Sequence, residues 1–184
     1  RGGTVYTMGS GWRMPSLTGY KGKGTMYVNG NVFIDGNITR DSSSAARRFQ
    51  SSLGIIATGN IYISSSVTQI DAILYAGGTI RTATDGAGNS VRTQNRLTLT
   101  GAMVGAKFDL TGRASVDTSF QGGNNPSAHA DACYSPGVSA QPAECYLYIA
   151  QILAVTPPGF QNVAGVIESA PRSGGERSPT VGTY

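Results

Sequence analysis

The chain has 184 residues and a mass of 19.0 kDa, which is the size of one domain with a hydrophobic core. Its 26 glycines and its low charged fraction of 13% indicate turn-rich β structure, and its hydrophobic fraction of 39% is too high for a disordered chain. The net charge of +4 comes from scattered basic residues, so nucleic acid is not an expected partner.

The N-terminal segment 1–23 is predicted to be an arm. Within it, Thr4, Val5, Tyr6, Thr7 and Met8 alternate in polarity like a strand, and no neighbouring segment offers a pairing partner. We expect either this arm or the similarly extended C-terminal segment 180–184 to add as a strand to another copy of the chain and so to produce a head-to-tail homopolymer. The alternative is that the arm folds back on its own domain.

Residues 24–41 contain a six-residue repeat. Each unit opens with glycine and has an apolar residue in its third position, as in Gly30-Asn31-Val32-Phe33-Ile34-Asp35. The apolar residues recur at every second position, and a turn pair closes the unit. Short strands separated by turns predict an all-β fold, a parallel β-solenoid, and a sandwich of hairpins is the alternative.

The repeat returns later in the chain. Residues 59–63 reproduce residues 30–34 with conservative changes, and strand-length pieces separated by glycine continue over 97–112. The predicted solenoid domain therefore spans residues 24–155. Its inward column is expected to contain Val32, Ile34, Ile61, Ile63 and Leu99.

Insertions at 41–53, 83–96 and 113–145 interrupt the repeat. A short helix is predicted over 41–53, because serines precede a helix-favouring Ala-Ala-Arg-Arg-Phe run and Gly54 ends it. Segment 83–96 is predicted to be a β-excursion or long loop, with a turn rather than a calcium site at 85–89. A long strand is expected over 146–155 and an extended tail over 156–184.

Residues on the outside of the predicted layers suggest further contacts. Asn31, Asn37 and Asn60 each follow a glycine, so they are expected either to hydrogen-bond between layers or to satisfy their own turns. Tyr27, Phe33 and Tyr62 point outward, where they either bind a sugar ring or partner or line an insertion.

The two cysteines, Cys133 and Cys145, lie in a Pro/Ser/Ala-rich loop. Their spacing favours a disulfide over a metal site, which would require more cysteine or histidine ligands. A disulfide indicates an oxidising compartment and therefore export.

The sequence shows no evident set of catalytic residues. His129 is the only histidine, and the sequence has no nucleophile-elbow motif that would supply a serine for a catalytic triad with it. Asp35, Asp71 and Asp109 lie near predicted strand ends, where they either cap turns or, brought together, provide acid-base or Ca²⁺ chemistry. We predict a protein that is not an enzyme and that binds no cofactor.

The longest apolar run, 146–155, is interrupted by Gln151 and is about half of the ~20 residues that a membrane-spanning helix needs, so no membrane span is expected. The chain starts at Arg1 without a charged-then-apolar leader. This start suggests that a signal or anchor has been removed or that the chain is a fragment.

The runs Gly59–Ile63, Val67–Ile80 and Leu97–Gly105 resemble the β-solenoid module of bacterial surface proteins linked to type IV pili and envelope appendages. More distantly, the stacked short strands resemble the polymer-forming bactofilins. The resemblance covers residues 24–112 and implies a noncatalytic, exported protein that assembles or adheres. The disulfide-like loop and the long C-terminal strand are departures from bactofilins, and they argue against a cytoplasmic filament.

The expected function is therefore a structural or adhesive subunit of the bacterial cell surface, with its own copies, surface polysaccharide or pilus components as partners. A polysaccharide-binding or polysaccharide-cleaving β-helix is the main alternative, and it would need clustered carboxylates or Ca²⁺ ligands on one face. A minor pilin is a third class, and it would need an apolar N-terminal helix of ~20 residues.

Overall fold

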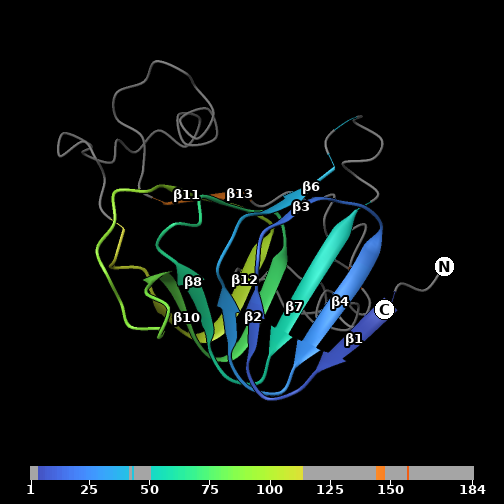
Figure 1. Ribbon diagram of the computed structural model, residues 1–184, viewed down its shortest axis with the longest axis horizontal. Helices are drawn as coiled ribbons and strands as arrows, with labels where there is room; N and C mark the ends of the chain where they lie inside the picture. The colour runs from blue at the N-terminus through green and yellow to red at the C-terminus, as the bar shows by residue number, and fades with distance from the viewer. Residues whose placement is uncertain (1–3, 42, 44–50, 114–143, 148–156, 158–184) are drawn as a thin grey trace, which may run out of the picture.

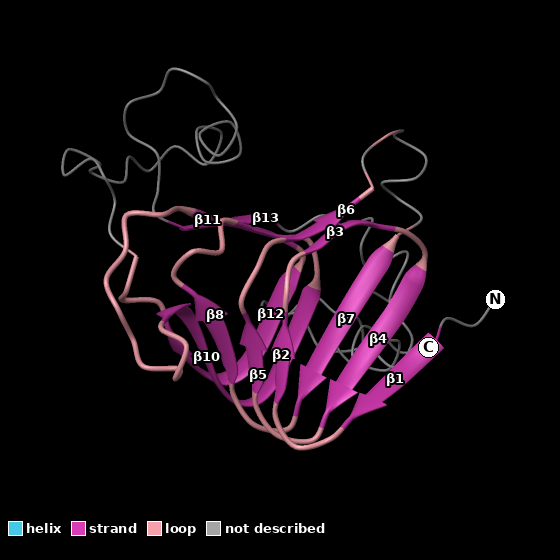
Figure 2. Ribbon diagram, in the orientation of Figure 1, coloured by secondary structure: helices cyan, strands magenta, loops and turns pink. Residues whose placement is uncertain are grey.

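The computed structural model describes residues 4–41, 43, 51–113, 144–147 and 157, and all of its regular elements are β-strands. Figure 2 shows strands joined by loops, without a helix in this part of the chain. Every pairing between the named strands is parallel. The all-β prediction is therefore confirmed, and hairpin pairing of these strands is excluded because hairpins are antiparallel.

The strands wrap around the core as a nearly closed sheet with three faces (Figure 1). The first face consists of β1 (Thr4–Met8), β4 (Lys23–Val28), β7 (Ser52–Ala57) and the first halves of β10 (Ile73–Thr84) and β12 (Ala102–Asp109). The second consists of β2 (Trp12–Met14), β5 (Val32–Ile34), β8 (Ile61–Ser64) and the second halves of β10 and β12. The third consists of β3 (Leu17–Tyr20), β6 (Ile38–Arg40), β9 (Gln69–Ile70), β11 (Leu97–Thr100) and β13 (Glu144–Leu147).

Consecutive strands of the chain lie on consecutive faces, and each such set is termed a layer. The layer β4–β5–β6 contains the three hexapeptide units, one on each face. The next layer repeats the register that the sequence predicts, because Val32 pairs with Ile61 and Ile34 pairs with Ile63. A six-residue unit therefore forms one short strand and one corner rather than a hairpin.

Strand β10 passes from the first face to the second without a loop. Its residues Ile73–Ala76 pair with β7, its residues Ile80–Thr84 pair with β8, and the register shifts between these segments. The bend lies at Gly77 and Gly78. A Cβ atom on Gly77 would lie 2.3 Å from the carbonyl oxygen of Thr58 in the layer below, so the close approach of the two chains requires glycine here.

The core lies inside the three faces. The five residues predicted to point inward are all fully or almost fully buried, which confirms this set: Val32, Ile34, Ile61, Ile63 and Leu99. A smaller apolar cluster contains Ile73 with Ile56 and Ala102, and it lies on the outer side of the first face because Ile73 alternates with the inward Leu74. The first face thus has apolar residues on both of its sides.

Two sequence predictions are wrong in the part of the chain that the structure describes. Residues 4–20 are the first layer rather than a free arm, because β1 pairs with β4 from Thr4–Gly24 to Met8–Val28. The helix predicted over 41–53 does not reach its expected end, because Ser52 and Leu53 begin β7 and are buried against the neighbouring layer. Burial of Ser52 and Leu53 against the neighbouring layer favours a strand over the local helix propensity. Residues 42 and 44–50 lie outside the described residues.

The C-terminal predictions are tested only in part. Strand β13 covers Glu144–Leu147, so only the beginning of the strand predicted over 146–155 lies within the described residues. The insertion 114–143 and the tail 158–184 lie outside them. Among the described residues, no helix has the length and hydrophobicity to cross a membrane.

Candidate functional site

The two ends of the layer stack have strand edges without a pairing partner among the described strands. These edges belong to β1, β2 and β3 at one end and to β12 and β13 at the other. On β2, Trp12 donates its N–H to the carbonyl of Asn31 at 2.9 Å, and Met14 accepts from the N–H of Asp35 at 2.8 Å. Because successive residues of a strand direct their main-chain groups to opposite edges, the N–H and C=O of Arg13 face away from β5.

The inward apolar residues of successive layers form columns that extend from one end of the stack to the other. Each column has one inward residue from every layer, and the three columns are Tyr6–Met26–Ile55–Leu74–Met103, Trp12–Val32–Ile61–Ile80–Phe108 and Leu17–Ile38–Ile70–Leu99–Tyr146. The members in the middle layers are buried, except for the partly buried Met26, whereas Tyr6 is 54% exposed, Phe108 is 42% exposed and Tyr146 is 41% exposed. Nothing among the described residues covers the ends of the columns.

A hollow of about 410 Å³ lies at the end formed by the last layer. Its lining is almost entirely apolar and consists of Leu99, Gly101, Ala102, Met103, Phe108, Leu110 and Tyr146. Aromatic rings and methionine make adaptable apolar contacts, so this surface suits an apolar partner better than a charged ligand.

Asparagine side chains connect neighbouring layers at the corners. The Oδ1 atom of Asn31 accepts the N–H of Asn60 at 2.8 Å, and the Oδ1 atom of Asn60 accepts the N–H of Thr79 at 2.7 Å. At another corner, Oδ1 of Asn37 accepts the N–H of Thr68 at 2.8 Å. The predicted hydrogen bonding between layers is confirmed for Asn31, Asn37 and Asn60.

Glycines lie over Asn31 and Asn60 in the next layer for a steric reason. A Cβ atom on Gly59 would lie 2.4 Å from Oδ1 of Asn31, and a Cβ atom on Gly78 would lie 2.3 Å from Oδ1 of Asn60. The amide of one layer therefore occupies the space that a side chain of the next layer would need. This packing accounts for the glycine of the Gly59-Asn60 pair, whereas a Cβ atom on Gly30 or Gly36 would instead meet Gly11 or Ser16 of the first layer.

The outward row on the second face combines aromatic and charged side chains. In register order it consists of Arg13, Phe33, Tyr62, Arg81 and Asp109. The rings of Phe33 and Tyr62 lie 4.9 Å apart between their centroids, with the Arg13 guanidinium over Phe33 and the Arg81 guanidinium over Tyr62. These contacts are cation–π interactions.

The loop 85–89 covers this aromatic pair. The carbonyl of Gly86 accepts a hydrogen bond from Arg13, the carbonyl of Gly88 accepts one from Arg81 at 3.0 Å, and Gly88 lies against the ring of Tyr62. Of the two readings for Phe33 and Tyr62, the structure supports the lining of an insertion. Tyr27 differs, because it lies on the first face and is partly exposed.

Asp85 holds the loop as a turn. Its Oδ1 atom accepts the N–H groups of Ala87 and Asn89, and its Oδ2 atom accepts the side-chain amide of Asn89. The hydrogen bond from the Asn89 side chain is the main cause that lowers the pKa of Asp85. The prediction of a turn is therefore confirmed.

The three strand-end carboxylates do not form a common site. Asp35 pairs with Arg13 at 2.8 Å, Asp71 lies 3.8 Å from Nε of Arg40, and Asp109 lies 3.5 Å from Nε of Arg81. Within the described part of the chain, no cluster of three or more His, Cys, Asp or Glu side chains could hold a metal ion. His129 lies outside the described residues.

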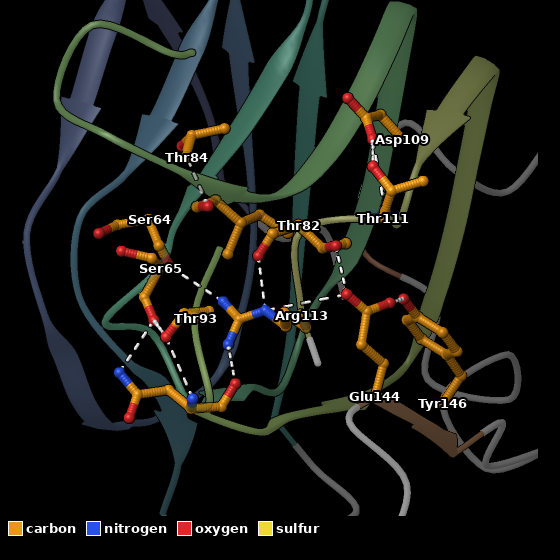
Figure 3. A network of polar contacts seen from close by, with 12 residues as sticks. Ser64, Ser65, Thr82, Thr84, Thr93, Asp109, Thr111, Arg113, Glu144 and Tyr146 are labelled. Atoms are coloured by element: carbon orange, nitrogen blue, oxygen red, sulfur yellow. Dashed lines mark hydrogen bonds and ion pairs between the residues drawn. The ribbon is translucent and has the colours of Figure 1, made fainter. Parts of the chain in front are cut away.

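The last layer contains a buried polar network around Arg113 (Figure 3). The guanidinium donates from Nε to the carbonyl of Thr82 at 2.6 Å, from Nη1 to that of Asn95 at 2.8 Å and from Nη2 to that of Ser64 at 2.9 Å. Its Nε atom also lies 3.8 Å from Oε1 of Glu144 on β13. Arg113 thus ties β8, β10 and β13 to one another.

Glu144 completes this network. It accepts hydrogen bonds from the hydroxyl groups of Thr82 and Tyr146. Burial lowers the pKa of Arg113, whereas the charge of Glu144 opposes that shift. Burial, together with the hydrogen bond to Glu144, raises the pKa of Tyr146, which therefore remains a neutral donor. Arg113 and Glu144 are far apart in the chain and follow no repeat, so no pattern in the sequence indicates this network.

Only one of the two cysteines of the predicted disulfide lies within the described residues. Cys145 lies on β13, where it pairs in register with Thr98, and it is not a free thiol. Cys133 lies outside the described residues, so the Cys133–Cys145 bridge stays a prediction.

No protein-family model matches the chain, and comparison with curated proteins and with solved structures finds no significant match.

Proposed function

We propose that this chain is a noncatalytic β-solenoid subunit that assembles head to tail into a filament or appendage of the bacterial cell surface. One observation carries the proposal: both ends of a parallel strand stack have open edges and uncovered apolar columns in the described part of the chain. Open edges of this kind pair readily with another chain unless they are blocked.

The parallel geometry favours head-to-tail growth. Within each face all strands run in one direction, so pairing of one end with the other end continues the parallel ladder, whereas pairing of an end with its own copy would be antiparallel. A contact between two different surfaces of the same chain is heterologous, and it forms an open filament when the rotation does not close into a ring.

Export and adhesion belong to the same proposal. The support comes from the sequence resemblance to appendage-linked surface proteins and from the predicted bridge between Cys133 and Cys145. Surface polysaccharide or pilus components are the proposed partners besides other copies of the chain. The uniform parallel layers support the solenoid, because each layer repeats the register of the previous one.

Electron microscopy and light scattering of the full-length protein over a range of concentrations test the proposal. We expect filaments that lengthen with concentration. The variant Phe108→Lys, at the exposed end of a column, should abolish them, because a charge would be buried in the joint.

Tyr27→Lys is the matched control. Tyr27 is 36% exposed, close to the exposure of Phe108, but it lies in a middle layer and should leave assembly unchanged. A full-length protein that stays monomeric at high concentration would contradict the proposal.

Polysaccharide binding is the second candidate function, and the outer side of the first face favours it. Tyr27 and Tyr75 project from the same outward row, separated by Ile56, and both are partly exposed. Aromatic faces of this kind stack on apolar ligand surfaces. If they bind sugar, Tyr75→Ala should weaken retention on a column of bacterial surface polysaccharide without affecting filaments, and unchanged retention would remove this candidate.

A further inference from the structure

We infer that the joint between two copies continues the layer register, with the first half of β12 pairing with β1 of the next copy, the second half with β2, and β13 with β3. This inference rests on the proposed assembly and specifies its geometry. The three strand segments at one end lie on the same three faces as the three strands at the other end. One copy can therefore follow another as one layer follows the next.

The apolar columns support this register. When the columns continue across the joint, Met103 contacts Tyr6 of the next copy, Phe108 contacts Trp12, and Tyr146 contacts Leu17. These contacts bury the aromatic groups that are exposed at both ends of the single chain. Phe108 and Trp12 then form an aromatic pair between adjacent strands, a favourable cross-strand contact.

The charged side chains at the two ends favour the same register. The outward row of the second face begins with Arg13 and ends with Asp109, so a continued register places the carboxylate of one copy beside the guanidinium of the next. Within one chain, Asp109 already lies 3.5 Å from Arg81 in the neighbouring layer. The joint would repeat this strand-to-strand pairing of opposite charges.

A joint rotated by one face would lose this match. The second half of β12 would then lie against β3, which spans Leu17–Tyr20 and contains no basic residue. Asp109 would have no cation of the next copy opposite it. The aligned joint is therefore the arrangement in which both the apolar columns and the charges have partners.

Disulfide trapping with the double variant Thr7→Cys/Val104→Cys tests the joint. Both residues are exposed, and they end the same outward row of the first face, Thr7–Tyr27–Ile56–Tyr75–Val104. Four strand spacings separate them within one copy, or ~19 Å, which a disulfide cannot bridge. Across the aligned joint they would be adjacent, with Cα atoms ~5 Å apart.

Under mild oxidation of the full-length double variant, we expect a ladder of covalent multimers on a non-reducing gel that a reductant removes. The single variants should give no ladder beyond dimers. Thr7→Cys/Lys107→Cys is the matched control, because Lys107 is also exposed but pairs on the second face and should not cross-link with Thr7. A ladder from this control instead would overturn the aligned register.

The two proposals fail in different ways. Filaments of the Thr7→Cys/Val104→Cys variant that are visible by electron microscopy but give no covalent ladder would overturn the joint and leave assembly standing. Absence of any multimer, covalent or not, in both the unaltered chain and the variant would overturn the assembly and the joint together.

Discussion

The middle layers and the end layers of this protein follow the same strand register, yet the exposure of their inward side chains differs sharply. Ile61 in a middle layer is completely buried, whereas Phe108 in the same column is 42% exposed. The difference comes from the number of neighbouring layers, because an end residue has one instead of two. Apolar exposure at the ends thus reflects an unfinished stack rather than a change of sequence pattern.

The two regions are also stabilised differently. In the middle, asparagine ladders at the corners repeat from layer to layer, as with Asn31 and Asn60. At the β12–β13 end, one buried arginine, Arg113, ties carbonyl groups of several segments together. The middle therefore has many equivalent contacts, and this end depends on a few strong ones.

The largest expected effect is at Arg113. Arg113→Ala leaves Glu144 buried without its cation and several carbonyl groups without a donor, so the free energy of unfolding should fall by about 3–5 kcal/mol. Urea denaturation below the concentration of assembly measures this. Arg92→Ala, at an exposed arginine, should change stability by less than about 0.5 kcal/mol. Equal losses in the two variants would contradict the assigned role.

The column itself gives the next comparison. Ile61→Ala creates a cavity between two layers and should cost about 2–5 kcal/mol. Phe108→Ala removes a side chain that is partly in solvent, so the dilute monomer should lose only about 1 kcal/mol. Matching losses at these two positions would show that the ends are as well packed as the middle.

A smaller effect is expected at the corner ladder. Asn60→Ala removes the acceptor for the N–H of Thr79, a loss of about 1–3 kcal/mol in thermal or urea unfolding. Asn60→Asp keeps an oxygen acceptor in that place and should recover part of the loss. If both variants unfold like the unaltered protein, the ladder does not stabilise the stack.

The smallest effect concerns pH at the end layer. Hydrogen bonds from Ser90, then from Thr111, with the charge of Arg81 as a further cause, lower the pKa of Asp109 below its ordinary value. Because the folded pKa is the lower one, this stabilisation is present above pH ~4 and is lost as the pH falls through the folded pKa. Asp109→Asn should therefore flatten the decline in stability below pH ~4. An unchanged slope in urea titrations at pH 5 and pH 3 would contradict this.

The parts of the fold that depend on local periodicity could be predicted from the amino-acid sequence. Alternation in the repeat placed Val32, Ile34, Ile61 and Ile63 inside, and the match between residues 30–34 and 59–63 is the observed strand register. The Gly-Asn pairs indicated contacts between layers, and the structure adds a steric reason for Gly59, which lies against the amide of Asn31. A period-two strand with glycine corners has few other ways to bury its apolar side.

The other features of the fold depend on contacts between segments that are far apart in the chain. The pairing of Thr4–Met8 with β4 and the strand at Ser52 depend on a neighbouring layer far away in the sequence, which local propensity does not register. The same holds for the Arg113–Glu144 network, which joins residues outside any repeat, and for the cover that loop 85–89 places over Tyr62. Each of these features buries polar or apolar groups against a segment that is distant in the sequence. The stabilisation therefore arises only after the layers have stacked.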